Sequence, residues 1–327
     1  MEVYNSNNSK KTFQGKDGIH YFKLFAPITC RKTKNCYKIL QFLGKGGNGS
    51  VYLTLCVSQD SENQGEYFAL KFFQKPRSDE RLKRFQEEIE ILKTINHPNI
   101  IKYYDDGSYD VTKHNLKLPF FISGYMPQTF DKAMINCRRI YSLMYATQLL
   151  SALKKLNKEG IIHRDIKPQN IFVNGLSVVL GDFGLMKRIN NGLSEDLLNE
   201  DIDMLSHSRC IGQPFYYRSP DIISYALKDS DLTTKSDIFQ LGLIFAEMFT
   251  GKNPLKPANN LSDPIEFKNP LLGFIKGNNA KSISNLITSM LELDSNNRPN
   301  VDDLLKRFIK LLEKYSYSKF ILDGQLF

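Results

Sequence analysis

The chain has no long apolar run. No stretch approaches the ~20 apolar residues that cross a membrane, and the longest candidate, Leu241 to Phe249, is interrupted by Glu247. Residues 1–11 also lack the apolar core of a secretory signal peptide. We therefore expect neither a membrane span nor secretion by a cleaved signal.

Cysteine is scarce, and no arginine-rich or aromatic RNA-binding signature is present. The five cysteines include no C-x-x-C pair, and such an odd, widely spaced set is typical of free thiols in a reducing compartment. We therefore expect a cytoplasmic protein. The net charge of +9 comes from lysines and arginines scattered among acids, which indicates solubility and affinity for anionic ligands and argues against nucleic acid.

The most informative stretch lies between Ile162 and Gly184. It reads His163-Arg164-Asp165-Ile166-Lys167-Pro168-Gln169-Asn170 and then, after a short apolar stretch, Gly181-Asp182-Phe183-Gly184. Phosphoryl transfer needs a carboxylate to orient a hydroxyl, a carboxylate and an amide for a metal, and a cation for the moving phosphoryl group. The two acids, the lysine and the asparagine of this stretch supply those groups.

These residues resemble the catalytic loop and metal-binding motif of eukaryotic-type (Hanks-type) protein kinases. The resemblance implies that Asp165 accepts or orients the substrate hydroxyl proton and that Lys167 neutralises charge on the phosphoryl group, as in Ser/Thr kinases. Asn170 and Asp182 would hold Mg²⁺, for which Mn²⁺ could substitute. His163 is expected to be structural.

A glycine-rich stretch stands where such kinases cover the phosphates of ATP. Gly44, Lys45, Gly46, Gly47, Asn48, Gly49, Ser50 and Val51 fit the pattern G-x-G-x-x-G-x-V. Glycines let the backbone approach phosphates closely. The residues on both sides are β-formers, which predicts strand, turn and strand and disfavours a dinucleotide-binding fold.

Lys71 and Glu88 are the predicted phosphate anchor and its partner. Lys71 ends Phe68-Ala69-Leu70-Lys71, which resembles the V-A-I-K strand. Apolar residues of the 81–92 segment recur at spacings of three and four, which predicts a helix with one apolar face. By the resemblance, Glu88 on this helix pairs with Lys71.

The resemblance also implies an adenine site. Pro119 to Met126 looks like a strand running into the hinge between lobes, with Ser123 as gatekeeper. The Gly124 carbonyl and the Met126 amide would bond the adenine edge. The ring would lie between Val51 and Ala69 on one side and Phe172 on the other.

Later motifs favour a protein substrate. Ser219-Pro220-Asp221 stands where the family has Ala-Pro-Glu, and Arg298 stands at its ion-pair partner. Asp237 opens the expected long central helix and should bond the catalytic-loop backbone. Small-molecule kinases of related fold generally lack the Asp221 and Arg298 apparatus.

The segment from Asp182 to Asp221 is long for the family and suggests regulation by phosphorylation. Arg164 is placed to receive a phosphate, and we expect Ser208, or otherwise Ser206, to be phosphorylated in trans through a transient homodimer. One departure concerns specificity. The stretch 212–218 contains no threonine where the family has one that bridges the catalytic acid and lysine.

We therefore predict an α+β, bilobal protein kinase fold. Its small lobe holds an antiparallel five-stranded sheet and one helix, and its large lobe is mainly helical. The expected boundaries are a polar, basic extension at 1–36, containing an extra strand or docking arm within Ile19 to Ile28, a kinase domain at 37–312 and a tail at 313–327. Within the domain, the small lobe is 37–122, the hinge 123–127 and the large lobe 128–312.

The predicted function is ATP- and Mg²⁺-dependent phosphorylation of Ser/Thr hydroxyls in protein substrates. Two alternatives stay open. The missing threonine leaves room for a kinase of tyrosine, dual or small-molecule specificity. A pseudokinase scaffold that binds nucleotide and partners without turnover would usually have lost Lys71, Asp165, Asn170 or Asp182, all of which are present.

Overall fold

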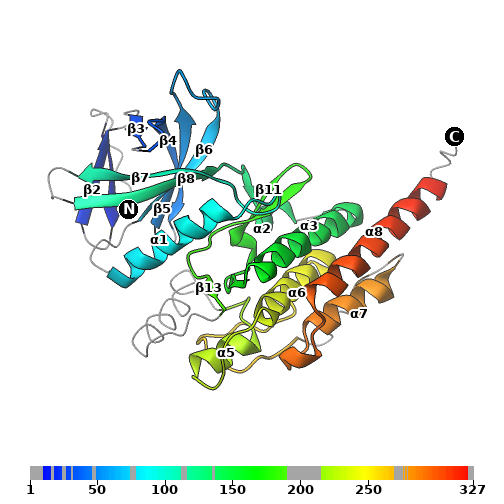
Figure 1. Ribbon diagram of the computed structural model, residues 1–327. Helices are drawn as coiled ribbons and strands as arrows, with labels where there is room; N and C mark the ends of the chain where they lie inside the picture. The colour runs from blue at the N-terminus through cyan, green and yellow to red at the C-terminus, as the bar shows by residue number, and fades with distance from the viewer. Residues whose placement is uncertain are drawn as a thin grey trace. The chain divides into compact units, whose positions relative to one another are not determined.

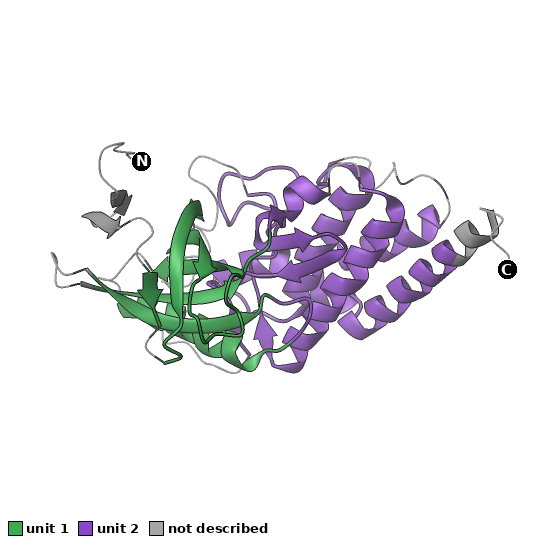
Figure 2. Ribbon diagram, turned by 90° about the horizontal axis from the view of Figure 1, so that it is seen from above, with its two compact units in different colours: residues 1–96, 101–126 green, residues 97–100, 127–327 purple. Residues whose placement is uncertain are grey.

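The computed structural model (Figure 1) divides into two compact units, coloured separately in Figure 2. Unit 1 comprises residues 1–96 and 101–126, and unit 2 comprises residues 97–100 and 127–327. The structure describes residues 10–15, 18–23, 27–30, 32–45, 49–73, 79–111, 116–134, 137–189, 215–268, 275, 277 and 279–322.

Unit 1 is built on a six-stranded antiparallel sheet with the strand order β3-β4-β5-β6-β8-β7. The five predicted strands are present, and β3 adds a sixth at the edge, from the segment expected to be an extension. A separate hairpin, β1–β2, precedes it. The bounds are β1 Lys10–Gly15, β2 Gly18–Lys23, β3 Pro27–Thr29, β4 Cys36–Lys45, β5 Gly49–Cys56, β6 Tyr67–Phe73, β7 Tyr103–Val111 and β8 Leu116–Gly124.

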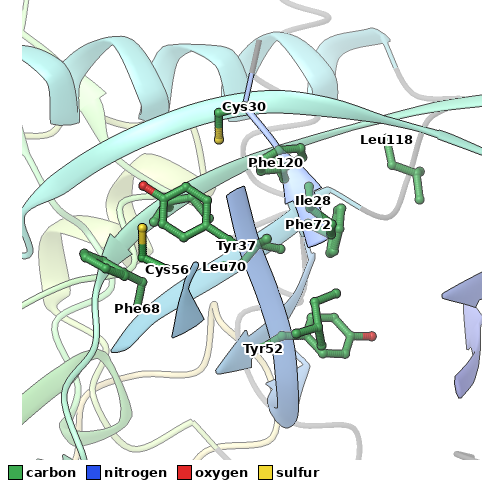
Figure 3. Close-up of a cluster of buried hydrophobic side chains, with 12 residues drawn as sticks. Ile28, Cys30, Tyr37, Tyr52, Cys56, Phe68, Leu70, Phe72, Leu118 and Phe120 are labelled. Carbon is green, nitrogen blue, oxygen red and sulfur yellow. The ribbon is translucent and has the colours of Figure 1, made fainter. Parts of the chain in front are cut away.

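One face of this sheet packs an aromatic-rich core (Figure 3). Burial alternates along β5 and β6, as the period of a half-buried strand requires. The rings of Tyr37 and Phe68 meet edge to face at 5.5 Å between centroids, and Phe72 meets Phe120 in the same way at 5.5 Å. The core includes Ile28 and Cys30, so the first edge strand is part of the packed unit.

The loop that joins β3 to β4 is tied to the far edge of the same sheet. The Thr33 hydroxyl donates to the carboxylate of Asp105, which is 1% exposed and lies in β7. The neighbouring Asp106 accepts from the Tyr103 hydroxyl at 2.5 Å and forms an ion pair with Lys93 at 3.4 Å. This loop is therefore held by a hydrogen bond from Thr33, while Ile28 of β3 is held by the core.

Helix α1 (Asp79–Thr94) confirms the helix predicted from apolar spacing. Its buried residues include Phe85, whose ring lies 5.3 Å from that of Phe73 and 5.5 Å from that of Phe121. Glu87 and Glu90 are exposed, whereas Glu88 is buried. Of these three neighbouring glutamates, the helix turns only Glu88 toward the sheet.

Unit 2 is mainly helical. Helix α6 is buried along nearly its whole length and ends at Gly251, whose φ of 76° suits the left-handed cap. Helix α5 begins at Ser219, whose side chain accepts from the Ile222 amide, with Pro220 in its first turn. The helices are α2 Phe130–Ala133, α3 Arg139–Lys158, α5 Pro220–Ala226, α6 Lys235–Thr250, α7 Ala280–Met290 and α8 Val301–Leu322, with short 3-10 helices at Pro168–Asn170 and Ser295–Asn297.

Unit 2 also contains short strands. Strands β10 to β13 lie between α3 and α5 in the sequence, and β9 precedes α2. A three-stranded sheet has the order β12-β11-β9, and a two-stranded one pairs β10 with β13. Their bounds are β9 Gln128–Thr129, β10 Ile161–Ile162, β11 Ile171–Asn174, β12 Ser177–Leu180 and β13 Lys187–Arg188.

The described residues bear on two predictions, one about membrane-spanning helices and one about the cysteines. Within them, no helix is both long and apolar enough to cross a membrane. The cysteines in the described part of the chain, Cys30, Cys36, Cys56 and Cys137, are free thiols, as predicted.

Candidate active site

Lys71 and Glu88 form the ion pair that the resemblance implies. The Lys71 ammonium donates to the Glu88 carboxylate, with Nζ to Oε1 at 2.8 Å and Nζ to Oε2 at 3.1 Å. The Glu88 side chain is 2% exposed and that of Lys71 is 13% exposed. A buried carboxylate needs such a partner, so this pair fixes the ammonium on β6.

The predicted adenine residues of unit 1 share the sheet face of Lys71. Val51 pairs with Lys71 across β5 and β6, and Ala69 pairs with Ser123 across β6 and β8. Paired residues of antiparallel strands point to the same side, as do residues two apart. Val51, Ala69, Lys71 and Ser123 therefore line the face opposite the aromatic core.

The glycine-rich turn joins β4 to β5. Gly44 pairs with Val51, and Lys45 pairs with Ser50. A Cβ on Gly49 would lie 2.2 Å from the Phe72 carbonyl oxygen, so only glycine fits against β6 there. Gly46, Gly47 and Asn48 lie outside the described residues.

In unit 2, the predicted catalytic lysine, Lys167, and the predicted metal ligand Asn170 meet at one carboxylate oxygen of Asp165. Asp165 Oδ2 accepts from Lys167 Nζ at 2.8 Å and from Asn170 Nδ2 at 2.8 Å. Asn170 Nδ2 also donates to the Asp165 carbonyl at 2.9 Å. The 3-10 turn Pro168–Asn170 brings Asn170 back onto Asp165, which explains the spacing of the motif.

Asp182 adjoins this cluster through the backbone. The Gly181 amide donates to the Asn170 carbonyl at 2.9 Å, which holds the start of the second motif beside the first. Asp182 itself is exposed and has a φ of 56°. Left-handed non-glycine residues are uncommon and concentrate at functional sites.

The donor set suits Mg²⁺. The amide nitrogen of Asn170 is committed to Asp165, so its oxygen is the atom it can offer to a cation. Asp182, which follows Gly181, is the second predicted oxygen ligand. Within the described part of the chain, no three His, Cys, Asp or Glu side chains gather as a metal cage. Mg²⁺ rarely uses such a cage and is commonly held by one or two protein oxygens together with substrate phosphates.

His163 has the predicted structural role. Its ring is fully buried and lies 4.8 Å from that of Phe183, and its Nε2 donates to the Gly181 carbonyl at 3.1 Å. Nδ1 accepts from the Asp165 amide at 3.4 Å, which specifies the neutral tautomer. Burial lowers the pKa of His163, in agreement with an uncharged ring.

Asp237 holds the catalytic loop from α6, as predicted. It accepts from the His163 amide at 2.8 Å and from the Arg164 amide at 2.9 Å. Arg164 has a φ of 68°, and these two bonds maintain that unusual backbone. Asp237 is fully buried, and burial raises the pKa of its carboxyl to about 7.

Gln240, one turn further along α6, was missed by the sequence reasoning. Its side-chain amide is hydrogen-bonded to Arg164, Ile166 and Tyr217. The available signal was its spacing of three residues from Asp237, which puts both side chains on one face of the helix.

The predicted pair of Asp221 and Arg298 is also present. The guanidinium donates to the carboxylate with Nη1 to Oδ2 at 2.6 Å, and the Arg298 side chain has no exposed surface. Arg298 also donates to the carbonyls of Glu292, Lys235 and Leu293. It joins α5 to the region where α6 and α8 begin.

The remaining predicted residues are placed as follows. Gly124 donates its amide to the Lys102 carbonyl at 2.9 Å, and Met126 is half-buried. Phe172 lies in β11, paired with Val179 and Thr129. The predicted phosphorylation sites Ser206 and Ser208, and the stretch 190–214 that contains them, lie outside the described residues.

Comparison with known proteins agrees with this geometry. The protein kinase domain family matches residues 37–309. The chain is 29% identical to "Probable serine/threonine-protein kinase nek3" of Dictyostelium discoideum, over 83% of this chain and 23% of the relative. It is 27% identical to human "Serine/threonine-protein kinase Nek5" over 85% of this chain and 37% of the relative.

A third relative, "Probable serine/threonine-protein kinase nek2" of Dictyostelium discoideum, is 30% identical over 82% of this chain and 61% of the relative. The matched regions thus span from about a quarter to three fifths of these relatives' lengths. Because the family pattern covers most of the chain, the chain belongs to the protein kinase domain family.

Proposed function

We propose that this protein transfers the γ-phosphoryl group of ATP to serine or threonine hydroxyls of protein substrates. The observation that carries the proposal is the arrangement around Asp165, whose Oδ2 accepts from both Lys167 and Asn170. Neither bond uses Oδ1, which leaves that oxygen for a substrate hydroxyl. Lys167, 20% exposed, is close enough to stabilise negative charge at the same place.

Each unit supplies groups suited to ATP. Lys71, fixed by Glu88, would contact its phosphates, and the sheet face with Val51 and Ala69 would pack on its adenine. Mg²⁺ held by Asn170 and Asp182 would neutralise charge on the phosphates. The protein groups bind and orient both reactants, which is the main requirement of phosphoryl transfer.

The preference for serine and threonine is supported by two observations. Lys167 is the lysine that the resemblance assigns to Ser/Thr kinases, and three relatives are named as serine/threonine-protein kinases. The Asp221 and Arg298 pair supports a protein as substrate rather than a small molecule.

Regulation by phosphorylation of Ser208 or Ser206 belongs to the same proposal. Arg164, the expected phosphate receiver, is 1% exposed and donates to the carbonyls of Leu185 and Met186. It therefore already touches the start of the segment that carries both serines. Mass spectrometry of the wild type and of an inactive Lys71→Met variant tests whether these sites are filled in trans.

The decisive experiment measures transfer of labelled phosphate from ATP with Mg²⁺ to the protein itself and to generic protein substrates. Asp165→Asn should lose at least about a hundredfold in rate, the usual range for removing a catalytic acid–base group. Asp182→Asn, which removes a proposed Mg²⁺ ligand, should also lose transfer. Asp229→Asn, at an exposed carboxylate outside the site, serves as the matched control.

The residue that carries the label decides specificity. Phosphoserine or phosphothreonine supports the proposal. Abundant phosphotyrosine, or label on a metabolite but on no protein, would contradict the specificity, and no transfer by a wild type that binds ATP would favour the pseudokinase scaffold.

A further inference from the structure

One side chain of α6 connects two segments of unit 2 that are far apart in sequence. Gln240 is 2% exposed. Its Nε2 donates to the Arg164 carbonyl at 2.9 Å and to the Tyr217 carbonyl at 2.8 Å. Its Oε1 accepts from the Ile166 amide at 3.1 Å.

These three bonds determine the orientation of the amide. A glutamine nitrogen has two N–H donors, and here each has its own carbonyl, while the oxygen faces an N–H group. Turning the amide over would place its oxygen against two carbonyls and its nitrogen against the Ile166 amide. Gln240 therefore has one arrangement that satisfies all of these buried groups.

The Gln240 amide forms hydrogen bonds with the backbone on both sides of Asp165. The Arg164 carbonyl belongs to the peptide unit before Asp165, and the Ile166 amide belongs to the peptide unit after it. Both peptide units that attach the proposed catalytic carboxylate to the chain are thus bound by a single side chain. Asp237 adds its two bonds one residue earlier, at His163 and Arg164.

The Gln240 amide also binds the segment 215–219, through the Tyr217 carbonyl. The Tyr217 hydroxyl donates to Glu247, also on α6, and the Asn253 side chain donates to the Tyr216 carbonyl at 3.1 Å. The Tyr216 side chain is nevertheless 40% exposed, so an aromatic ring projects from a firmly held backbone. Such a ring is suited to contact a substrate chain.

We propose that Gln240 is a positioning residue that fixes Asp165 relative to the substrate-facing segment at Tyr216 and Tyr217. The inference rests on the proposed phosphoryl transfer. The stretch 212–218 has no threonine, the residue that the family resemblance expects to link this segment to the catalytic acid. The Gln240 amide supplies a link of this kind from α6.

Loss of the Gln240 hydrogen bonds should affect the protein substrate and ATP differently. Asp165 and the segment would shift relative to each other, which lowers kcat and raises KM for a protein substrate. Lys71 and Glu88 lie in unit 1 and make no hydrogen bond with Gln240, so KM for ATP should stay within about twofold. A small displacement of a reacting group can cost up to about a hundredfold in rate.

The test compares two variants with a matched control. Gln240→Met keeps the length of the side chain and removes all three bonds, whereas Gln240→Glu keeps an acceptor for Ile166 and removes both donors. Gln148→Met is the control, because Gln148 also makes three hydrogen bonds in unit 2, to Asn99, Val178 and Leu176, away from the catalytic loop. Far-UV circular dichroism establishes that each variant is folded at the assay temperature.

We expect both Gln240 variants to lose about ten- to hundredfold in kcat/KM for a protein substrate, with KM for ATP unchanged, while Gln148→Met stays within about twofold of the wild type. An active wild type with Gln240 variants indistinguishable from the control would overturn the inference and leave the proposed function standing. An equal loss in all three variants would also overturn it. A wild type without transfer would refute the proposed function and the inference together.

Discussion

Asp237 should make the stability of the protein depend on pH. Burial raises the pKa of its carboxyl from 3.8 to about 7 in the folded state, while in the unfolded chain it returns toward the ordinary value. Between these two values the folded state keeps a proton that the unfolded state has lost. The resulting stabilisation is fully present below about pH 4 and is lost as the pH rises through 7.

The size of the effect follows from the two pKa values. Each unit of difference corresponds to about 1.4 kcal/mol, so the whole window is worth about 4 kcal/mol. Integrating between pH 5 and pH 8 gives a loss of about 2–3 kcal/mol. Asparagine does not titrate, so the Asp237→Asn variant should lack this pH-dependent contribution to the free energy of unfolding.

The assay is urea unfolding of the wild type and Asp237→Asn at pH 5 and pH 8. Far-UV circular dichroism is the suitable probe, because the chain contains no tryptophan. The asparagine keeps one acceptor for the two catalytic-loop amides, so we expect the variant to be less stable at both pH values. From pH 5 to pH 8, the difference in free energy of unfolding between the two proteins should narrow by about 2–3 kcal/mol. An identical pH dependence in both proteins would refute the reasoning.

Three substitutions test tertiary contacts within the two units by thermal or urea unfolding. Asp221→Ala should cost about 3 kcal/mol, since it leaves the buried Arg298 guanidinium without its ion pair; a loss below about 1 kcal/mol would show that its carbonyl partners suffice. Gly242→Ala should cost about 1–3 kcal/mol, because its Cβ would lie 2.9 Å from a Cβ at the end of α7; unchanged stability would mean that α7 shifts freely. Thr33→Val should cost about 1–3 kcal/mol by leaving the buried Asp105 carboxylate without that donor, and an unaltered midpoint would argue against a close bond.

The sequence predicted most of the polar groups of the site because local motifs determine them. Asp165, Lys167 and Asn170 lie within one turn of chain, so their meeting follows from their spacing. Lys71 and Glu88 are adjacent in space because a strand and the next helix present them to each other. Such contacts join residues that are close in sequence, so the local pattern is enough to predict them.

The links that were missed depend on tertiary packing. Gln240 lies 74 residues from Ile166, and its spacing of three residues from Asp237 was the one sequence signal that linked it to the catalytic loop. Likewise, Ile28 and Cys30 lie in a segment that reads as polar and basic, and only the sheet shows that they join the core. In these cases the position of a residue depends on tertiary packing, which local composition does not reveal.

Strand β3 also bears on where an independently folding unit begins. The family match starts at residue 37, yet β3 covers the outer edge of β4, and the following loop binds Asp105. A chain shortened to begin at Tyr37 would expose the backbone N–H and C=O groups of β4 together with the apolar surface under Ile28. Uncovered strand edges pair readily with other strands. Such a fragment should associate with copies of itself, and residues 27–36 should prevent this.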